Sequence, residues 1–498
     1  MARQNKVHLR LPNDQEFLPV AQAFIRETAS RFGLGGSSLG QIEVASEEAI
    51  INVIKHTYDV EENDTFEIVC ERLPNGIRVV IKERGIPFDP SQAPRYQPAA
   101  GIEDADSSGL GIFLMRELVD ECTFRNLGPE GKETVLVKYS ENADAPIPAH
   151  DASPGPAEPE VIREELDYTV RHMADHEAIE VSRCAYKSHG YSFFDDHIYY
   201  PERLVELNHS GQMISAVAVT KDNRFMGHSA LLFQDDADRI AELTFVFVNV
   251  EYRGQGALGR MIEFLFDAPA SRPLDGLYAY SVANHPFTQK STTRFGIHDC
   301  GILLATSPAS WKFRGIPGDP TQRISVVLSF KYITPPVRQT LYPPARHREM
   351  VERLYRNIGA DHDYRVPDPH RPHDPAALTR IVTSDNASEG CAELYLSHYG
   401  PDAVLAVRRL LRRYCLQKYA AINLFLNLGD PDTFHLTGEF EKMGFFFAGI
   451  LPRARVGDTL MLQYLNNVDL AYDKICAVSD VARDVLAYIR ANDPNADL

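Results

Sequence analysis

Residues 142–160 constrain the fold most, because they divide the chain. Their sequence, NADAPIPAHDASPGPAEPE, holds five prolines and has no hydrophobic period. Proline lacks a backbone N–H and fixes φ, so this stretch continues neither a helix nor a sheet and predicts a stiff polar linker. A chain of 498 residues also exceeds the size of one hydrophobic core. Together with a weaker break at 334–336, the sequence predicts a first domain over 1–142, a linker over 143–160, and further parts over 161–333, 334–466 and 467–498.

Charge and cysteine usage exclude several classes of protein. The formal net charge is −18, which argues against a broad nucleic-acid surface. No apolar run approaches the roughly 18 residues that span a bilayer, and the N-terminus lacks the apolar core of a signal peptide. The seven cysteines are scattered without a CxxC pair. We therefore expect a cytoplasmic protein that contacts neither membrane nor nucleic acid.

A helix over residues 41–58, QIEVASEEAIINVIKHTY, carries the first candidate site. Its apolar residues recur with a helical period. Glu48 and Asn52 are four residues apart, so they share one face. An amide oxygen can bind Mg²⁺ while a carboxylate accepts a proton, although such a pair on a surface helix is usually only solvated.

The context of this helix strengthens the interpretation. A strand pair is expected over 66–72 and 76–82, and the second strand runs into ERGIPFDP at 83–90. Gly109 and Gly111 then open an apolar helix over 112–119, and a strand over 134–139 follows. Glycines at a helix N-terminus allow backbone N–H groups to approach a phosphate.

This order of motifs resembles the GHKL ATPases, and PFDP with GLGIFLMRELVDE resembles bacterial anti-sigma-factor serine kinases. The resemblance implies a two-layer sandwich that binds ATP and Mg²⁺ and acts on a sigma factor or its antagonist. It implies that Asn52 holds Mg²⁺ and that Glu48 is the catalytic base. The remaining nucleotide-binding residues would be Glu83, Gly85, Gly109, Gly111 and Thr134. The family has Asp where this chain has Glu83, which moves the carboxylate by one methylene.

Residues 240–266, IAELTFVFVNVEYRGQGALGRMIEFLF, predict a strand, a glycine-rich turn and a helix. Such a turn can present N–H groups to a pyrophosphate. The segment resembles the acetyl-CoA loop of GNAT acetyltransferases over about residues 160–333, and the resemblance implies that Glu242 is a base acting through water. The implied acetyl-CoA contacts are Val250, Arg253, Gly254, Gln255, Gly256, Ala257, Gly259 and Asn284. The last loop glycine is displaced by one position. Thr292 stands where the family often has a Tyr that serves as general acid.

An internal similarity predicts a second copy of this unit. FGIHDCGIL at 295–303 aligns with MGFFFAGIL at 443–451, and each lies between strand-like runs. The second copy lacks an RGQG equivalent, because GPDA at 400–403 precedes its helix. We therefore expect a degenerate, structural GNAT-like unit and a final helix from about Asp469.

Three further features have simple interpretations. The stretch 361–373 contains Asp361, His362, Asp363, His370 and His373 among prolines, and is expected to be a solvated loop. Four arginines on the helix 403–414 are expected to form a solvated face, and Trp311 is expected in the core.

The sequence thus predicts an α/β (α+β) protein, a GHKL sandwich followed by tandem GNAT-like domains. The leading function is a serine/threonine kinase-like regulator of transcription fused to an N-acetyltransferase. Two alternatives stay open: a non-enzymatic sensor of ATP and acetyl-CoA, and an acetyltransferase with a regulatory ATP domain. The partner, the acyl acceptor, catalytic competence and a homodimer also stay open.

Overall fold

The computed structural model describes residues 6–56, 65–73, 75–84, 87–88, 110–140, 166–189, 193, 195–267, 272–309, 322–368 and 378–496. Gly85, Gly109, Trp311, His370 and His373 therefore lie outside the described residues, as does the linker. The chain forms two compact units. The first comprises Met1–Glu164, Ala174–Leu204 and Asn249–Glu251, and the second comprises the rest. Within the described ranges, no helix has the length and apolar character needed to cross a bilayer.

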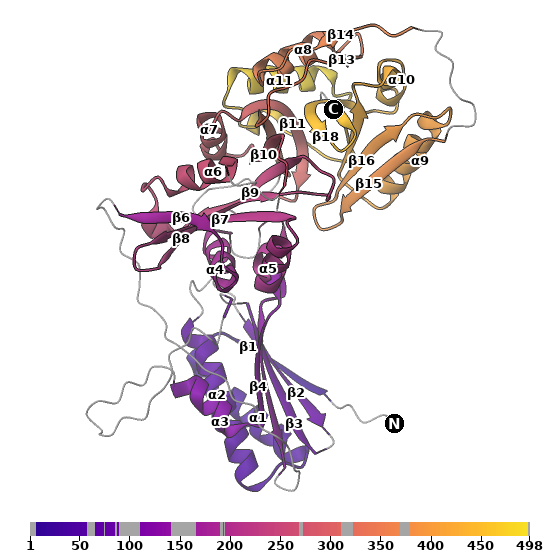
Figure 1. Cartoon of the computed structure of the whole chain (residues 1–498). Helices are drawn as coiled ribbons and strands as arrows, with labels where there is room; N and C mark the ends of the chain where they lie inside the picture. Colours follow the sequence, from indigo (N-terminus) through magenta and orange to yellow (C-terminus); the bar gives the residue numbers. More distant parts are fainter. Residues whose placement is uncertain are drawn as a thin grey trace. The chain divides into compact units, whose positions relative to one another are not determined.

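The first unit contains a five-stranded antiparallel sheet with helices on one face (Figure 1). Its strand order is β1-β2-β3-β5-β4, from β1 (Lys6–Pro12), β2 (Thr65–Leu73), β3 (Gly76–Glu83), β4 (Glu121–Asn126) and β5 (Lys132–Tyr139). The helices are α1 (Leu18–Arg31), α2 (Gly36–His56) and α3 (Leu110–Leu118). Alternate residues of β3, such as Ile77, Val79 and Ile81, are buried in one core with the helices. The expected two-layer arrangement is therefore present in the described residues.

The strand β4 was missing from the sequence expectation. Its residues ECTFRN alternate between exposed and half-buried, so no apolar stripe marks them. The strand forms because it lies at the sheet edge and pairs with β5 in register, for example Phe124 with Thr134. An edge strand needs only one hydrogen-bonding neighbour. Pairing with β5, and not a hydrophobic pattern, therefore determines that residues 121–126 form a strand.

The segment 174–204 of the first unit is helical. It contains η4 (Asp175–Glu177), α4 (Ala178–His189), η5 (Asp196–Tyr199) and the start of α5 (Pro201–His209). Ser182 on α4 donates to the carbonyl of Ile198 at 2.7 Å, which joins α4 to η5.

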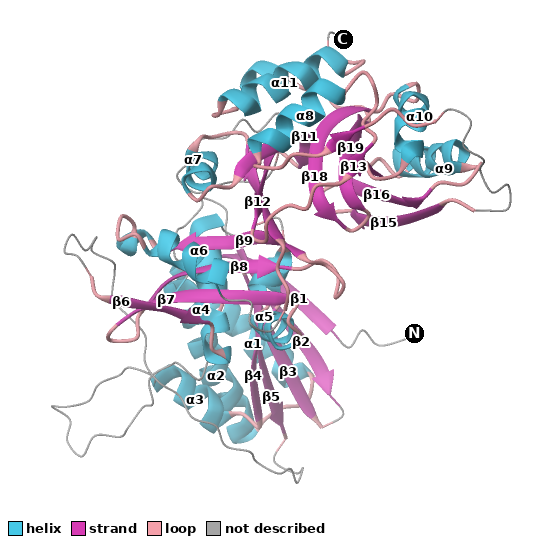
Figure 2. Cartoon of the chain, turned by 45° about the horizontal axis from the view of Figure 1, so that its top comes forward, coloured by secondary structure: helices cyan, strands magenta, loops and turns pink. Residues whose placement is uncertain are grey.

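The second unit contains a sheet of twelve strands (Figure 2). Their order is β15-β16-β17-β19-β18-β11-β12-β10-β9-β8-β7-β6. The first half of the repeat supplies β6 (Tyr168–His172), β7 (Met213–Thr220), β8 (Phe225–Leu232), β9 (Ile240–Val248), β10 (Gly276–Val282), β11 (His298–Ser307) and β12 (Ile324–Tyr332). The second half supplies β15 (Arg380–Asn386), β16 (Cys391–His398), β17 (Ala421–Asn427), β18 (Phe446–Ala454) and β19 (Gly457–Leu465). The mixed α/β class is confirmed.

On both sides of the central β11–β18 pair, corresponding strands follow one another in the same spatial order. Moving out from β11 one meets β12, β10, β9 and β8; moving out from β18 one meets β19, β17, β16 and β15. In each half the second and third of these strands are parallel to each other, and the other neighbouring pairs are antiparallel. This arrangement agrees with two copies of one α/β unit related by an approximate two-fold axis.

Backbone details support the same correspondence. Gly296 and Gly444, two residues before β11 and β18, both have positive φ, +70° and +100°. Ala305 and Arg453, at the same place along these strands, have φ of 53° and 52°. The two strands pair with each other at Gly301 and Gly449, where a Cβ on Gly449 would lie 2.3 Å from the Cα of Gly301. The halves therefore join through equivalent glycines that allow close backbone approach.

Helices cover the sheet of the second unit. They are α6 (Ala257–Asp267), α7 (Phe287–Arg294), α8 (Arg348–Asn357), α9 (Ala403–Leu416), α10 (Pro431–Glu441) and α11 (Asp480–Asn492), with η6 (Val250–Tyr252), η7 (Tyr472–Lys474) and the short strands β13 (Thr340–Leu341) and β14 (Asp363–Tyr364). The final helix begins later than expected from the apolar spacing. It starts at Asp480 because the Ser479 hydroxyl caps it by accepting from the N–H of Ala482 at 2.9 Å.

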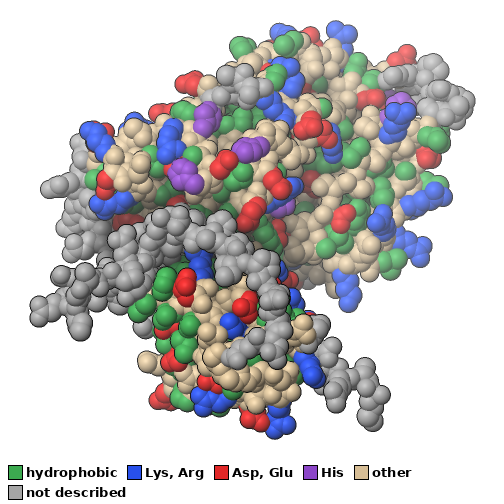
Figure 3. All heavy atoms as spheres, turned by 60° about the horizontal axis from the view of Figure 1, so that its bottom comes forward, with side chains coloured by type: hydrophobic (Ala, Val, Ile, Leu, Met, Phe, Trp, Pro, Cys, Tyr) green, Lys and Arg blue, Asp and Glu red, His purple; other side chains and the backbone are tan. Residues whose placement is uncertain are grey.

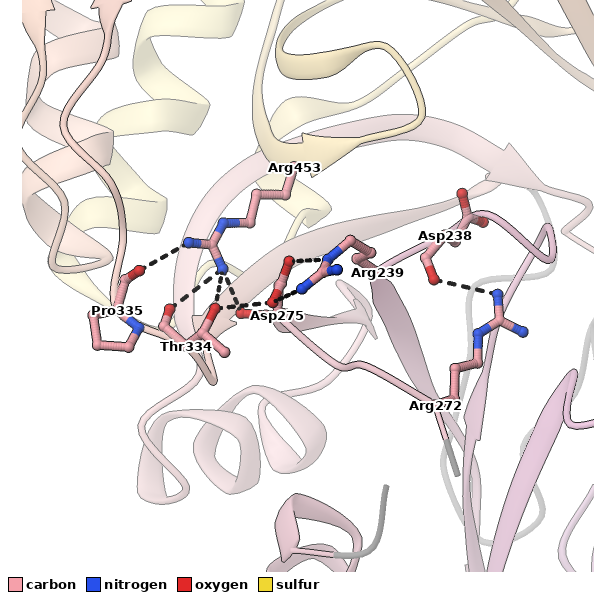
Figure 4. Close-up of polar contacts among 7 residues, drawn as sticks. All are labelled: Asp238, Arg239, Arg272, Asp275, Thr334, Pro335 and Arg453. Atoms are coloured by element: carbon pink, nitrogen blue, oxygen red, sulfur yellow. Dashed lines mark hydrogen bonds and ion pairs between the residues drawn. The ribbon is translucent and has the colours of Figure 1, made fainter. Parts of the chain in front are cut away.

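Arg453 connects the two halves (Figure 4). Its guanidinium donates to the carbonyl of Asp275 at 2.9 Å, to the Thr334 hydroxyl at 2.6 Å and to the carbonyl of Pro335 at 2.9 Å. Arg239 in turn binds the carboxylate of Asp275 through both its Nε and Nη2. The segment 334–336, where a break was expected, is therefore held by hydrogen bonds from Arg453 within the second unit. The four predicted domain boundaries stay predictions.

Candidate functional sites

Helices α2 and α3 bring three predicted nucleotide-site residues together. Glu48 and Asn52 lie one turn apart on α2, and Gly111 lies in the first turn of α3. A Cβ on Gly111 would lie 2.6 Å from Oε2 of Glu48 and 3.8 Å from Nδ2 of Asn52. Only glycine fits there without displacing the Glu48 side chain, so the start of α3 is held directly against the carboxylate and the amide. A helix start beside such a pair suits an anionic ligand with a bound cation.

Glu83 and Thr134 lie on the helix-covered face of the same sheet. Thr134 is paired with Ile81, a core residue, and Glu83 is paired with Lys132 two positions along. The carboxylate of Glu83 is 9% exposed and forms an ion pair with Lys132, Nζ to Oε1, at 2.9 Å. Glu83 therefore has a basic neighbour that the motif alone does not reveal, because Lys132 is remote in sequence.

The backbone that follows Glu83 is held by residues from two sides. Asn126 accepts from the N–H of Phe88 at 2.9 Å and donates to its carbonyl at 3.0 Å. On α4, Arg183 donates to the carbonyl of Pro87 at 3.0 Å, and Tyr186 donates to the carbonyl of Arg84 at 3.1 Å. The described part of the ERGIPFDP motif is thus anchored to β4 and to α4.

The glycine-rich turn before α6 has the expected backbone character. Gly254 and Gly256 have φ of +86° and +77°, a region that side chains disfavour. The hydroxyl of Tyr168 on β6 donates to the carbonyl of Gln255 at 3.1 Å, and the Gln255 side chain accepts from the N–H of Leu166 at 3.2 Å. Gln255 therefore anchors the turn in the described residues. Arg253 is exposed, and Val250 is 54% exposed.

Strands β9 and β10 separate next to this turn. They pair in parallel over only three residues each, from Ile240 with Gly276 to Glu242 with Tyr278. Beyond that point β9 contains an irregularity at Phe245, which has φ of 52° although it is bulky and buried. His228 on β8 bonds to the carbonyl of Phe245 through Nδ1 at 2.8 Å. A strand that leaves its partner exposes N–H and C=O groups that a ligand can bind.

Glu242 lies where this separation starts. It is 6% exposed and stands opposite Tyr278, which is 7% exposed. Burial, and then the charge of Glu242, raise the pKa of the Tyr278 hydroxyl well above its usual value. Asn284, two residues after β10, has a buried Oδ1 without a hydrogen-bond partner among the described residues. Thr292 does not face this site with its hydroxyl, which donates to the carbonyl of Gln289 on its own helix at 2.9 Å.

The expectation of a solvated loop at 361–364 is wrong for His362. Its side chain is 4% exposed, and its ring contacts that of Tyr355 at 4.6 Å between centroids. The segment is ordered because β14 pairs with β13. His362 and Asp458 line a cavity of about 530 Å³ whose walls include Asp238, Arg239 and Arg453. Burial lowers the pKa of His362 and raises that of Asp458.

Other polar clusters have structural explanations. Within the described residues, one group could hold a metal by geometry, Asp195, Asp196 and His197. Asp195 caps η5 through the N–H of His197 and also contacts its ring at 2.9 Å, so the cluster forms a helix cap. The arginines of α9 are exposed, as expected for a solvated face. On the face drawn in Figure 3, acidic and basic side chains are intermixed.

Comparison with known proteins identifies the first unit. Residues 11–138 match the family described as "Histidine kinase-like ATPase domain". The serine-protein kinase RsbW of Oceanobacillus iheyensis is 27% identical over 130 residues, which cover 25% of this chain and 82% of that protein. RsbW of Bacillus thuringiensis is 24% identical over 161 residues, 30% of this chain and 99% of that protein. Residues 11–138 are thus a histidine kinase-like ATPase domain that resembles the anti-sigma-factor serine kinases.

Solved structures similar to part of the chain are acetyltransferases. The spermidine/spermine N-acetyltransferase SpeG from Vibrio cholerae is 14% identical, with a TM-score of 0.26, over 33% of this chain and 92% of that chain. The ribosomal-protein-S18-alanine N-acetyltransferase from Escherichia coli is also 14% identical, with a TM-score of 0.27, over 34% of this chain and 95% of that chain. These scores are low, so the second site depends on the separated strands, the glycine turn and the unpartnered amide oxygen of Asn284.

Proposed function

We propose that the first unit binds ATP with Mg²⁺ in the cytoplasm and regulates a protein partner by phosphorylating or sequestering it. The sequence resemblance suggests a sigma factor or an anti-sigma-factor antagonist, and hence transcription regulation. The observation that carries the proposal is the position of Gly111 against Glu48 and Asn52. It agrees with a site where helix N–H groups, a carboxylate and an amide oxygen meet.

The residues fit this chemistry. When bound, ATP supplies the γ-phosphoryl group. Asn52 would supply an oxygen ligand for Mg²⁺, and the N–H groups at the start of α3 would contact the phosphates; Gly85 and Gly109 are further nucleotide contacts by the sequence resemblance. Glu48 accepts the proton of the partner's serine hydroxyl as its oxygen bonds to γ-phosphorus and the bond to the ADP oxygen breaks. Glu83 and Thr134 contact the base, and the neighbouring Lys132 makes Glu83 a determinant of base preference.

Calorimetric titration of the intact chain with ATP and Mg²⁺ tests the proposal. Asn52→Ala should lose at least about tenfold of the Mg²⁺-dependent affinity, since one oxygen ligand disappears. Glu48→Gln should keep binding and lose phosphotransfer to the partner. Glu47→Gln removes a carboxylate one residue away and serves as the matched control. An intact chain that binds no ATP would refute the proposal. If Glu48→Gln still regulates the partner as the unaltered chain does, a non-enzymatic sensor is favoured.

A second activity is supported by the separation of β9 and β10: binding of acetyl-CoA and acyl transfer to an amine. When bound, acetyl-CoA supplies a thioester. The turn over Arg253, Gly254, Gln255, Gly256, Ala257 and Gly259, together with Val250 before it, contacts the pyrophosphate, and Asn284 offers its unpartnered Oδ1. Glu242 takes a proton from the acceptor ammonium, and the amine nitrogen bonds to the thioester carbon. As the C–S bond breaks, the Tyr278 hydroxyl protonates the leaving sulfur, and the second proton of the nitrogen passes to the Tyr278 oxygen.

Titration of acetyl-CoA into the intact chain tests this second activity. Saturable binding that Asn284→Ala weakens supports it. Absence of binding to the intact chain contradicts it, and leaves the ATP site untouched because the two ligands use separate residues.

A further inference from the structure

The cavity of about 530 Å³ that His362 and Asp458 line is built by both halves of the second unit. The first half contributes residues 235 and 237–239 before β9, Asp275 before β10 and Tyr332 at the end of β12. The second half contributes residues 453–455 and 457–458, around the turn between β18 and β19. A volume of this size suits a small molecule. The described lining contains none of the residues proposed above for ATP or acetyl-CoA, so a different ligand has to be considered.

The most deeply buried polar groups of this cavity are not satisfied by the protein. Asp458 is 6% exposed, and its Oδ1 accepts from the N–H of Arg453 at 3.1 Å. Among the described residues, no cationic side chain forms an ion pair with Asp458. His362 is 4% exposed, and its Nε2 has no hydrogen-bond partner in the described part of the chain. A buried carboxylate and a buried ring nitrogen left in this way are costly, and a polar ligand would reduce the cost.

A second carboxylate of the lining has the same deficit. Asp238 is half-buried, and its Oδ2 accepts from the N–H of Asp235 at 2.8 Å. It too forms no ion pair with a described residue. Burial raises the pKa of Asp238, as it does that of Asp458, which agrees with a shortage of cationic partners at both carboxylates.

The basic side chains of the lining lie nearer to the solvent and keep unused donors. The side chains of Arg239 and Arg455 are 57% and 36% exposed. Arg239 binds Asp275 through Nε and Nη2, so its Nη1 has no acceptor among the described residues (Figure 4). Arg455 binds Asp235 through Nη2 alone, so its Nε and Nη1 are in the same state within the described ranges. The cavity therefore offers carboxylates at depth and guanidinium N–H groups towards its opening.

We propose that this cavity binds a small zwitterion, a free α-amino acid, at a site separate from the ATP and acetyl-CoA sites. The ammonium group of the ligand binds the carboxylate of Asp458, with Asp238 as a further acceptor. Its carboxylate binds the unused N–H groups of Arg239 and Arg455, which suit a carboxylate in geometry and charge.

The mixed charge of the lining argues against ligands of a single sign. The four aspartates Asp235, Asp238, Asp275 and Asp458 would repel a purely anionic ligand, and the three guanidinium groups would repel a purely cationic one. A molecule that carries one ammonium and one carboxylate satisfies both sets of groups. Because the two sets come from both halves, the ligand would also stabilise the contact between them. The proposal does not depend on either activity proposed above.

The test begins with thermal unfolding of the intact chain in the presence of each of the twenty standard amino acids. A ligand that binds the folded state raises the unfolding temperature. The amino acid with the largest effect is then titrated calorimetrically beside two analogues, one without the ammonium group and one without the carboxylate. The amino acid should bind at least about tenfold more tightly than either analogue, because each analogue loses charge-assisted hydrogen bonds. The proposal is overturned if no amino acid binds with a Kd below about 1 mM, or if either analogue binds equally well.

Asp458→Asn assigns the ammonium contact. Asparagine keeps an Oδ1 acceptor for the N–H of Arg453 and removes only the charge. The variant should weaken amino-acid binding about tenfold or more, and it should leave the affinity for the analogue without the ammonium group unchanged. Asp236→Asn is the matched control, because Asp236 is exposed and lies outside the cavity lining, and it should change nothing.

Arg455→Gln covers the case in which Asp458→Asn fails to fold, since Arg455 is partly exposed. It should weaken amino-acid binding about tenfold and leave the affinity for the analogue without the carboxylate unchanged. Arg356→Gln on α8, where the arginine is 70% exposed, is its control. Amino-acid binding that persists unchanged in every variant that folds overturns the proposal. ATP and acetyl-CoA affinities should stay unchanged throughout, so titration with those two ligands tests the proposed function separately.

Discussion

The strand pairs β9/β10 and β16/β17 are equivalent in the repeat but differ in how far they stay together. The first pair is bonded over three register positions, and the second over six, from Cys391 with Ala421 to Leu396 with Leu426. Phe245 has a left-handed backbone in β9, whereas no described residue of β16 does. The turn after β9 contains Gly254 and Gly256, while the turn after β16 has the sequence Gly-Pro-Asp.

These differences concern the backbone groups that each strand pair leaves unbonded. A parallel pair that stays bonded uses its own N–H and C=O groups and offers none to a ligand. The second half therefore extends the sheet through a fully bonded parallel pair, while in the first half β9 and β10 are not paired beyond Glu242 and Tyr278. The strained Phe245 and the positive-φ glycines are departures from regular structure of the kind found at ligand sites.

The largest expected effect comes from exchanging Glu242 on β9. Glu242→Gln should lower kcat for acyl transfer about 100-fold or more, because a general base contributes 10²–10⁴. Acetyl-CoA affinity should stay unchanged, since Glu242 lies on β9, outside the glycine turn that we propose for the pyrophosphate. Steady-state kinetics and calorimetry measure the two effects, and Glu263→Gln on the exposed face of α6 is the control. If Glu242→Gln keeps kcat within about twofold of the unaltered chain, Glu242 is not the base.

A smaller effect is expected at the two turns. Gly256→Val should weaken acetyl-CoA binding about tenfold to fiftyfold, because a β-branched residue at φ of +77° costs of the order of 1–3 kcal/mol and the turn must shift to relieve it. Gly400→Val at the corresponding turn of the second half should leave the affinity unchanged. Calorimetric titration of each variant with acetyl-CoA measures the two affinities. Loss of binding in Gly400→Val would mean that the second half also binds the cofactor.

The sequence predicted the elements with strong local signals. The helix carrying Glu48 and Asn52, the hairpin after it and the glycine turn before α6 lie close to their expected bounds, because apolar period and glycine position decide them locally. The edge strand β4 and the burial of His362 were missed, since both depend on pairing with distant residues. The Glu83–Lys132 ion pair was missed for the same reason, because ion pairing across strands is a tertiary feature.

The smallest expected effect concerns His228, which supports the irregularity in β9. Burial lowers the pKa of His228 from 6.5 to about 4, so the folded protein holds the ring neutral while the unfolded chain takes up a proton below pH 6.5. Stability therefore falls as the pH drops from 6.5 towards 4, and this residue should cost on the order of 1 kcal/mol between pH 7.5 and 5.5. The equivalent position of the second half is Arg380. Urea unfolding at both pH values should show a smaller acid loss in His228→Gln than in the unaltered chain. An identical loss would mean that the ring is not buried against Phe245, and that the separation of β9 from β10 has another cause.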